Sequence, residues 1–410
     1  MRSFDAARAI SDAREMSFPR LVGTPDEIRV RELVVDKLKQ IGLQVKQFPF
    51  QFYPAMPFGI LRHVLLIGAV LLTIHRILLS LTPRWGAVLG LALPLVARVL
   101  WNQYRTAAAR KLEDLTAEHP IQARLIPHAH TVLRSANIVA DLPVDGEVNK
   151  RLVLSAHTDS KSQNMSIVTR AVCAIYFALG VFILPVLTLP GAIWPGWLTG
   201  TSGVVWWVLF ALALLGALIL LTLQVGNESP GAVDNAGSCA LLLETARALS
   251  ENPPQGVAVR VLLTGAEEMG LAGGYAYAQD AIKDPDWREA VHLNFEAVGL
   301  GNKLFITSES GPTGSHARTA QAATELTQTA CRGVGVKPRK LGKLIGGEAD
   351  HIPLVEAGLS AVTLMFTGAG GTVVHTKNDK PELVREDSMA LAGKIVLAAV
   401  AHLEEKKKAT

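Results

Sequence analysis

The stretch VAVRVLLTGAEEMGLAGG (257–274) joins an aliphatic run to a glycine-rich turn that carries Glu267 and Glu268 side by side. The run has the length and the β-branched content of a buried strand. A pair of adjacent glutamates, taken alone, is most often part of a solvated loop. Whether this pair has a function therefore depends on which residues the chain places after its other strands.

Strand-like and helical segments alternate along most of the chain. Helices are expected at 7–16, 26–42 and 234–250. Strands are expected at 45–50, 135–142, 151–156, 257–265, 290–296, 303–307 and 360–366. This alternation predicts an α/β fold with a mixed, largely parallel central sheet and helices on both faces.

The composition indicates a membrane component. Of the 410 residues, 49% are hydrophobic and 19% are charged, whereas globular proteins contain about 25% charged residues. The net charge of +4 gives no reason to expect a nucleic-acid partner. Three widely spaced cysteines imply neither a disulfide framework nor a cysteine-rich metal site. The first 16 residues lack the apolar core of a secretory signal.

Four apolar stretches interrupt the α/β pattern, at 64–82, 85–101, 171–190 and 203–225. A helix that spans a membrane needs about 20 apolar residues. The last two stretches carry no charge, whereas the first two contain Arg76 and Arg98; buried core helices are the alternative for both pairs, and they fit the first pair better. Short connections predict two transmembrane helical hairpins, with four spanning helices in all.

The hairpins divide the chain. The first is expected at 57–101 and the second at 171–225, which leaves one discontinuous α/β domain made of 1–56, 102–170 and 226–410. Basic residues gather at the hairpin ends next to that domain: Arg62, Arg98, Arg105, Arg110, Lys111 and Arg170. The positive-inside rule therefore places the domain on the cytoplasmic side, although Arg76 and Arg84 near the far turn argue the other way. Four tryptophans near the second turn have the composition of an interfacial belt: Trp194, Trp197, Trp206 and Trp207.

Titratable residues stand at the ends of the predicted elements. His157 directly follows a strand, and Glu296 is the last residue of another. His375 follows a strand after a glycine-rich loop, and Asp234 opens a helix. Each has an ordinary alternative, such as a core histidine, a loop residue or a helix cap. Because ligand sites in such sheets lie beyond the carboxyl ends of the strands, we expect these side chains to meet.

Imidazoles and carboxylates without cysteine are a donor set of catalytic zinc sites. Two zinc ions about 3.5–4 Å apart need a bridging carboxylate and separate terminal ligands. Asp234 is expected to be the bridge. One ion would take His157 and Glu296. The other would take Glu268 and His375.

The remaining two acids then have distinct expected roles. Adjacent residues on a turn point in different directions, so Glu268 can bind metal while Glu267 faces water as the general base. Asp159 lies two residues after His157 and is expected to accept the second N–H of that imidazole, which would fix its tautomer. This division of roles gives the glutamate pair a function.

Six stretches, in this order, resemble motifs of the co-catalytic di-zinc aminopeptidase family, within the clan MH zinc exopeptidases: LSAHTDS, GAVDNAGSCALLLE, LLTGAEEMGLAGG, NFEAVGLG, GEADHIPLVEAG and HTKND. The resemblance implies hydrolysis of N-terminal peptide bonds by a di-zinc-activated water. It implies the same metal ligands, namely His157, Asp234, Glu268, Glu296 and His375, with Glu267 as base and Asp159 as the histidine orienter. Most of the family has aspartate at the position of Glu296. NFEAVGLG most resembles the endoplasmic-reticulum and vacuolar membrane metallopeptidases.

Other readings stay open. A single-zinc aminoacyltransferase of the glutaminyl-cyclase kind is the alternative enzyme, and a non-catalytic membrane scaffold is the alternative from another class. The expected partners are a lipid bilayer and peptide substrates, which are amphipathic or membrane-associated if the second hairpin brings the pocket to the bilayer surface. Equally, the hairpins could only anchor the domain. The exopeptidase direction and the oligomeric state stay undetermined.

Overall fold

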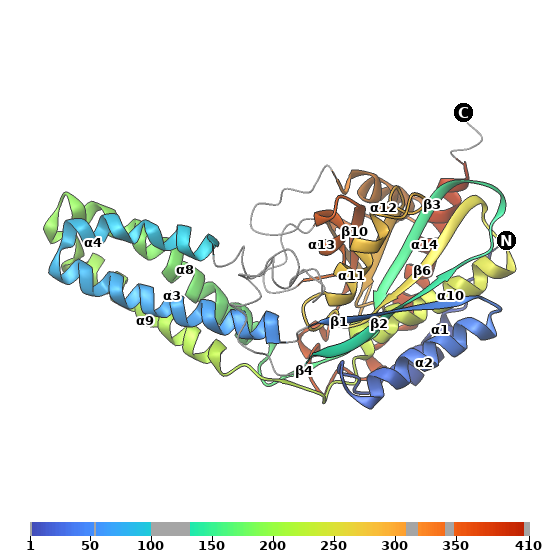
Figure 1. Ribbon diagram of the computed structural model, residues 1–410, viewed down its shortest axis with the longest axis horizontal. Coiled ribbons are helices and arrows are strands. Elements are labelled where there is room, and N and C mark those ends of the chain that lie inside the picture. Colours follow the sequence, from blue (N-terminus) through green and yellow to red (C-terminus); the bar gives the residue numbers. More distant parts are fainter. Residues whose placement is uncertain (1, 53–54, 100–131, 309–318, 341–347, 406–410) are drawn as a thin grey trace.

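An eight-stranded mixed sheet forms the centre of the α/β part of the molecule (Figure 1). The computed structural model describes residues 2–52, 55–99, 132–308, 319–340 and 348–405. The strand order is β1-β2-β6-β3-β7-β10-β8-β9. The strands are β1 (Val45–Phe52), β2 (Leu133–Asp141), β3 (Asp145–His157), β6 (Gln255–Thr264), β7 (Val291–Glu296), β8 (Lys303–Thr307), β9 (Arg339–Lys340) and β10 (Ser360–Thr367).

The four central strands, β6, β3, β7 and β10, run parallel to one another. β1, β2 and β8 join the sheet by antiparallel pairing, and β9 pairs in parallel with β8. The centre is buried on both faces: in β3, Leu152 and Leu154 pack into one hydrophobic cluster while Val153 packs into another. Successive side chains of a strand point to opposite faces, so an aliphatic run without alternation suits this place.

Helices cover both faces of the sheet, as predicted. On one side lie α1 (Ala6–Met16), α2 (Pro25–Gln40), α10 (Gly237–Glu251), α12 (Gln321–Gly333) and α14 (Glu386–Glu405). On the other lie α11 (Ala272–Ala281) and α13 (His351–Glu356). The mixed α/β class with a parallel centre is therefore confirmed.

The helix predicted at 234–250 begins later than expected, at Gly237. Asp234 and Asn235 have non-helical backbone angles within a turn, η3 (Ala232–Ala236). The carboxylate of Asp379 accepts hydrogen bonds from the backbone N–H groups of Val233 and Asp234, at 2.8 and 3.1 Å. A side chain from a distant loop thus shapes this turn, and Asp234 is not the simple N-cap that its position in the sequence allows.

A buried carboxylate ties the N-terminal helix to the sheet layer. Glu244 of α10 is fully buried and accepts hydrogen bonds from Arg8 Nε and Nη2, both at 2.7 Å. It also accepts from the backbone N–H of Asp5 and from Arg247 Nη1, both at 3.1 Å. Four donors thus converge on one side chain.

We expect Glu244→Ala to destabilise the fold by about 2 kcal/mol, because buried donors lose their acceptor. The loss is moderated by the exposure of Arg8, whose side chain is 45% exposed. The thermal midpoint, measured by near-UV circular dichroism in detergent, reports the change. The matched control is Glu289→Ala, which removes one partner of an exposed ion pair with Arg288 and should leave the midpoint in place. Equal midpoints for the two variants would contradict the role of the buried carboxylate.

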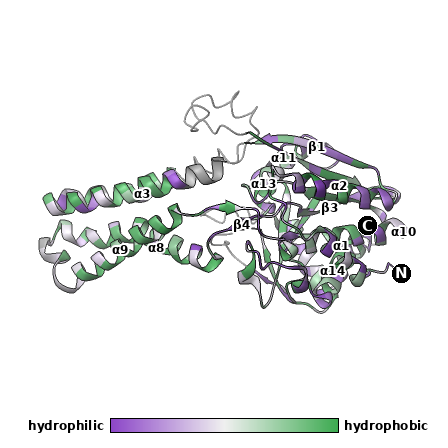
Figure 2. Cartoon of the chain, turned by 90° about the horizontal axis from the view of Figure 1, so that it is seen from below, coloured by the Kyte–Doolittle hydropathy of each residue, from purple (hydrophilic) through white to green (hydrophobic). Residues whose placement is uncertain are grey.

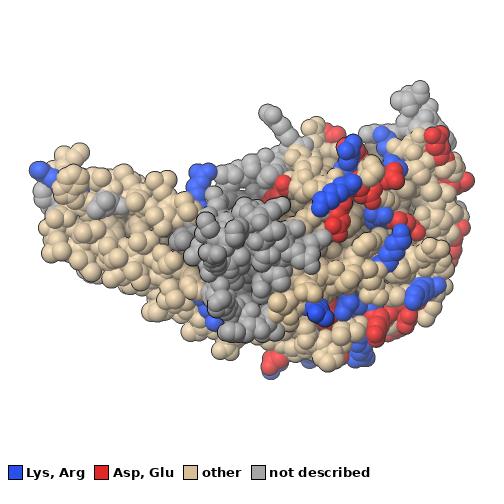
Figure 3. All heavy atoms as spheres, in the orientation of Figure 1, with Lys and Arg blue, Asp and Glu red and all other residues tan. Residues whose placement is uncertain are grey.

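Apolar helices project from one end of the α/β part (Figure 1). They are α3 (Ala55–Leu81), α4 (Pro83–Gly90), α8 (Ile167–Thr188) and α9 (Gly200–Leu221), with the 3₁₀ turns η1 (Leu189–Ala192) and η2 (Pro195–Leu198) between α8 and α9. Hydrophobic residues dominate them (Figure 2), and Figure 3 shows few charged side chains over their surface. Large apolar side chains face outward, for example Val204 and Leu218 at 64% and 62% exposure. Such a surface fits lipid better than water.

Within the described residues, three helical segments are long and apolar enough to cross a membrane: Arg62–Leu81, Ile167–Ala192 and Gly200–Leu221. Four were predicted, and the fourth is not confirmed. In the predicted span at 85–101, α4 ends at Gly90, a turn follows at Leu91, the backbone is helical again at 92–99, and residues 100 and 101 lie outside the described residues. Arg105, Arg110 and Lys111, which support the predicted orientation, also lie outside the described residues.

The polar residues inside the first predicted span are accommodated by neighbouring helices. His75 is buried, and a side chain at Gly90 would collide with its ring, so glycine allows α4 to lie close to α3. The Arg76 guanidinium lies 4.4 Å from the ring centre of Trp207, at a distance that suits a cation–π contact. These contacts explain how a helix interrupted by a histidine and an arginine can still pack in an apolar bundle.

Candidate metal centre

All seven titratable residues singled out in the sequence lie together at the carboxyl ends of the parallel strands. His157 is the last residue of β3, and Glu296 is the last residue of β7. The glutamate pair follows β6, and His375 follows β10 after the 3₁₀ turn η4 (Gly371–Val373). Since β6, β3, β7 and β10 are neighbours, their ends bring together residues far apart in the chain.

Two ligand groups share one carboxylate. In the first group, His157 Nε2 lies 3.0 Å from Asp234 Oδ1 and 3.5 Å from Glu296 Oε2. In the second group, His375 Nε2 lies 3.0 Å from Asp234 Oδ2 and 3.1 Å from Glu268 Oε2. Within each group the donor atoms all lie within 4.8 Å of one another. The two oxygens of Asp234 thus face different histidines, which is the arrangement of a bridging carboxylate.

The longer side chain of Glu296 is held in place from two sides. Asn294 Nδ2 donates to Glu296 Oε1 at 2.9 Å, and Asn235 Nδ2 donates to Oε2 at 2.7 Å. Burial raises the pKa of Glu296, against the opposing influence of His157. Both asparagines position the first group, and neither was predicted as a site residue.

Glu267 lies beside the first group without belonging to it. Its Oε2 atom is 3.9 Å from His157 Nε2, and its side chain is buried. Burial raises the pKa of Glu267 well above its usual range; His157 opposes this rise, while Glu268 and Glu296 add to it. A carboxyl group with an elevated pKa next to a ligand cluster has the properties of a group that exchanges protons.

Asp159 contacts the glutamate pair rather than the imidazole alone. Its carboxylate accepts hydrogen bonds from the backbone N–H groups of Glu267 and Glu268, each at 3.1 Å. His157 Nδ1 lies 3.1 Å from the backbone oxygen of Asp159 and 3.5 Å from its carboxylate. The expected orientation of His157 therefore comes chiefly from a carbonyl group. Ala266, with φ of 57°, turns the chain so that two consecutive N–H groups can reach one carboxylate.

Two basic residues contact the second group and were not predicted as site residues. Lys161 Nζ lies 2.8 Å from Glu268 Oε2, and it donates to the backbone oxygen of Glu268 at 3.0 Å. Arg170 Nη2 donates to His375 Nδ1 at 3.1 Å. Lys161 stands only four residues after His157, and this short spacing could have indicated its place in the site. Arg170 is 205 residues from His375, and its position in the sequence indicates only the end of a membrane helix.

The donor set suits zinc. It consists of imidazole and carboxylate groups, and Glu268 Oε1 is buried without a hydrogen-bond partner. Seven carboxyl groups meet at or beside the two groups: Asp159, Asp234, Glu267, Glu268, Glu296, Asp350 and Asp379. Three basic side chains face them: Arg20, Lys161 and Arg170. Burial raises the pKa of Asp350 to about 7 and that of Asp379 to about 6, because removal from water disfavours the charged carboxylate.

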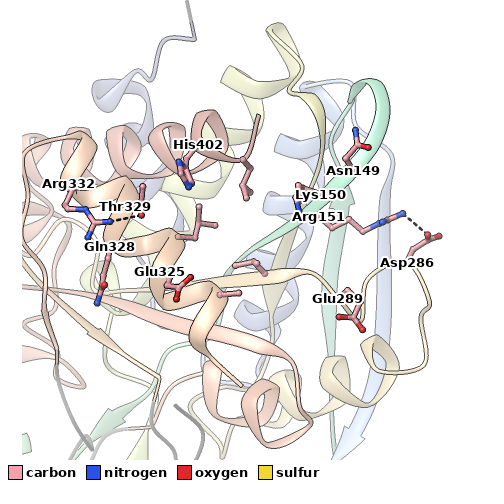
Figure 4. A pocket seen from close by; sticks show the side chains of 14 residues that line it. Asn149, Lys150, Arg151, Asp286, Glu289, Glu325, Gln328, Thr329, Arg332 and His402 are labelled. Carbon is pink, nitrogen blue, oxygen red and sulfur yellow. Dashed lines mark hydrogen bonds and ion pairs between the residues drawn. The ribbon is translucent and has the colours of Figure 1, made fainter. Parts of the chain in front are cut away.

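A cavity of about 560 Å³ lies elsewhere in the molecule (Figure 4). It is lined by Lys150, Arg151, Asp286, Glu325, Arg332 and His402, among others. Arg151 and Val291 stand at the beginnings of the parallel segments of β3 and β7, whereas the metal ligands stand at their ends. This cavity is therefore at the opposite edge of the sheet and is separate from the metal centre.

A comparison with protein families matches residues 220–400 to the model of peptidase family M28. Aminopeptidase YwaD of Bacillus subtilis (strain 168) is 29% identical over 188 residues, which cover 44% of this chain and 39% of that protein. Endoplasmic reticulum metallopeptidase 1 of Mus musculus is 31% identical over 189 residues, which cover 43% of this chain and 19% of that protein. The matches thus span less than two thirds of either relative.

Solved structures share the fold at low identity. A zinc aminopeptidase from Bacillus subtilis superposes with a TM-score of 0.55 at 16% identity, covering 98% of this chain and 96% of that one. A glutaminyl cyclase from Porphyromonas gingivalis gives a TM-score of 0.55 at 14% identity, with 99% and 100% covered. Both likenesses concern the fold, because the same architecture carries an aminopeptidase in one case and a cyclase in the other.

Proposed function

Residues 220–400 form a domain of peptidase family M28, and from this premise we propose that the chain is a membrane-embedded, zinc-dependent aminopeptidase. The observation that carries the proposal is the pair of ligand groups that share Asp234, with Glu267 beside them. The names of the relatives support the choice of aminopeptidase over carboxypeptidase. Retention of a buried base next to the ligands argues against a non-catalytic scaffold.

The proposed ligands are His157, Asp234, Glu268, Glu296 and His375. When bound, zinc would supply a Lewis acid that lowers the pKa of water and stabilises negative charge on the carbonyl oxygen. Glu267 would accept a proton from the attacking water and donate it to the nitrogen of the leaving amine. Asp159 would hold the backbone of the Glu267–Glu268 turn, so that one carboxylate binds metal and the other handles protons.

We propose that two zinc ions bind, one in each group. With every group ionised, the seven carboxylates exceed the three basic side chains by four charges, which two divalent ions would balance. Burial raises the pKa of Glu296 and Asp379. Against the effect of burial, the neighbouring histidines lower the pKa of Asp234, and His375 and Lys161 lower that of Glu268 to about 2. A glutaminyl-cyclase-like enzyme with one zinc is the alternative, favoured by the shared fold.

We propose that the hairpins at 57–101 and 171–225 anchor a discontinuous peptidase domain made of 1–56, 102–170 and 226–410. The base of the second hairpin reaches the metal centre, since the backbone N–H of Gln163 donates to the backbone oxygen of His375 at 2.9 Å. The pocket would then lie close to the bilayer surface, which suits amphipathic or membrane-associated peptides. Arg62 and Arg170, at the helix ends next to the domain, support the cytoplasmic side.

A chelation experiment tests the function. Stripping the metal with 1,10-phenanthroline should abolish release of N-terminal residues from a peptide library, and added zinc should restore it, because the base alone cannot activate water sufficiently. N-acetylated peptides are the control and should not be cleaved. Hydrolysis that persists without metal would contradict the proposal, as would equal cleavage of acetylated peptides. Conversion of N-terminal glutamine to pyroglutamate, without hydrolysis, would favour the cyclase.

The same library tests the substrate class. Peptides carrying an acyl chain and presented on phosphatidylcholine vesicles should be cleaved more efficiently than the same peptides free in solution. Equal kcat/KM for both forms would show that the hairpins only anchor the domain.

A protease experiment tests the orientation. If the domain faces the cytoplasm, protease added outside sealed inverted vesicles should digest it readily.

A further inference from the structure

The two ligand groups differ in the charges around them, and this difference lies in one stretch of chain. Residues 160–170, here called the connecting segment, lead from β3 into α8 and include the short strand β4 (Ser162–Gln163). β4 pairs with β5 (Val225–Gly226), where the chain returns from α9. Asn164 binds the chain between α9 and β5, through Thr222 O and the backbone N–H of Gln224. The connecting segment is therefore the base of the second hairpin.

Three residues of this segment contact the second group. Lys161 binds Glu268 through both its carboxylate and its backbone oxygen. Arg170, in the first turn of α8, donates to His375 Nδ1, and the backbone N–H of Gln163 donates to His375 O. His375 itself has φ of 63°, a left-handed conformation that is uncommon for residues other than glycine. The hairpin base is thus part of the wall of the second group.

The first group has different surroundings. In the described part of the chain, no lysine or arginine side chain forms an ion pair or hydrogen bond with its members. Glu296 is held by two neutral asparagine amides, and His157 Nδ1 faces the backbone oxygen of Asp159. A histidine that binds metal through Nε2 normally donates its Nδ1 proton to such an acceptor. His157 is therefore already arranged as a ligand.

His375 is arranged in the opposite way. A histidine that binds metal through Nε2 carries its proton on Nδ1, and a protonated Nδ1 cannot accept a hydrogen bond from the Arg170 guanidinium, which has only donors. Binding of a cation at Nε2 therefore requires Arg170 to withdraw from Nδ1. Lys161 adds a second positive charge, 2.8 Å from Glu268 Oε2, and it would compete with a bound cation for that carboxylate and repel the cation.

This inference rests on the proposed zinc function. We propose that Lys161 and Arg170 are positioning residues that weaken metal binding at the second group. The ion of the first group binds tightly. The ion of the second group binds weakly, and its binding depends on the hairpin base, because both opposing charges belong to the connecting segment. The hairpin that anchors the domain would then also control how many ions the centre holds.

The proposal is tested by titrating zinc into the metal-free, full-length protein in detergent. Isothermal titration calorimetry measures the binding steps. The wild type should show one tight and one weak step, and His375→Ala should remove only the weak one. Lys161→Gln and Arg170→Gln should each strengthen the weak step roughly tenfold or more. The tight step should stay unchanged, and it also reports that the first group is folded.

Two control variants separate charge from structure. Arg170→Lys keeps the charge and should leave the second step weak. Arg62→Gln removes a basic residue that contacts Leu223 O, where the chain returns from α9, and it should change neither step. Two equal steps in the wild type, or a weaker second step in Lys161→Gln and Arg170→Gln, would overturn this inference while leaving the zinc peptidase intact. Absence of stoichiometric zinc binding in the wild type would overturn both.

Discussion

Replacing Glu267 by glutamine is expected to lower kcat by about 10²–10⁴-fold, because an amide cannot carry a proton from water to the leaving amine. Zinc binding should remain, since Glu267 lies beside the ligand groups and belongs to neither. KM should change little for the same reason. The measurement is steady-state hydrolysis of an aminoacyl amide, together with the zinc content of the purified variant.

The proton-transfer role is specific to this side chain. Glu228→Gln, the same substitution at an exposed position before Asp234, is the control and should retain full activity. If Glu267→Gln kept near-normal kcat, the assignment of the base would be wrong. If it lost zinc as well as activity, Glu267 would be a ligand, and the division of roles within the glutamate pair would have to be reversed.

Replacing Asp234 by asparagine is expected to weaken zinc binding at both groups by about a hundredfold or more and to abolish turnover. The two carboxylate oxygens face His157 and His375 separately, at 3.0 Å each, and a neutral amide offers one oxygen acceptor instead of two. Calorimetric zinc titration measures both steps in one experiment. The effect should exceed that of removing any ligand that serves a single group.

Glu296→Gln provides the matched comparison. It makes the same carboxylate-to-amide change in a residue of the first group only, so one zinc step should weaken and the other should persist. Loss of a single ion in Asp234→Asn would show that this carboxylate does not bridge. The pair of variants thus tests the shared ligand independently of turnover.

Much of the site could be predicted because its residues stand next to recognisable strands. The aliphatic runs before His157, Glu267 and Glu296 identify β3, β6 and β7, and these three strands do run parallel. Once parallel strands are assumed, their carboxyl ends must share an edge. The prediction of a common cluster then needs no knowledge of side-chain geometry.

Details that depend on distant backbone could not be predicted. The role of Asp159 depends on a left-handed Ala266 that aims two N–H groups at its carboxylate. The turn at Asp234 depends on Asp379, which is 145 residues away. In the first hairpin, a turn at Leu91 separates α4 from the helical residues 92–99, although the apolar composition alone predicts one continuous helix.

By itself, the sequence determined the elements and the edge of the sheet at which the chemistry lies, because hydrophobic periodicity and strand-end residues are local properties of the chain. Only the tertiary structure decided which oxygen of Asp234 faces which histidine and which side chains neutralise each group. Arg170 and His375 are 205 residues apart, and their contact exists only because the hairpin base folds against the loop after β10. Electrostatic interactions depend on distances of a few ångströms, and those distances are set by packing between segments that no local pattern relates.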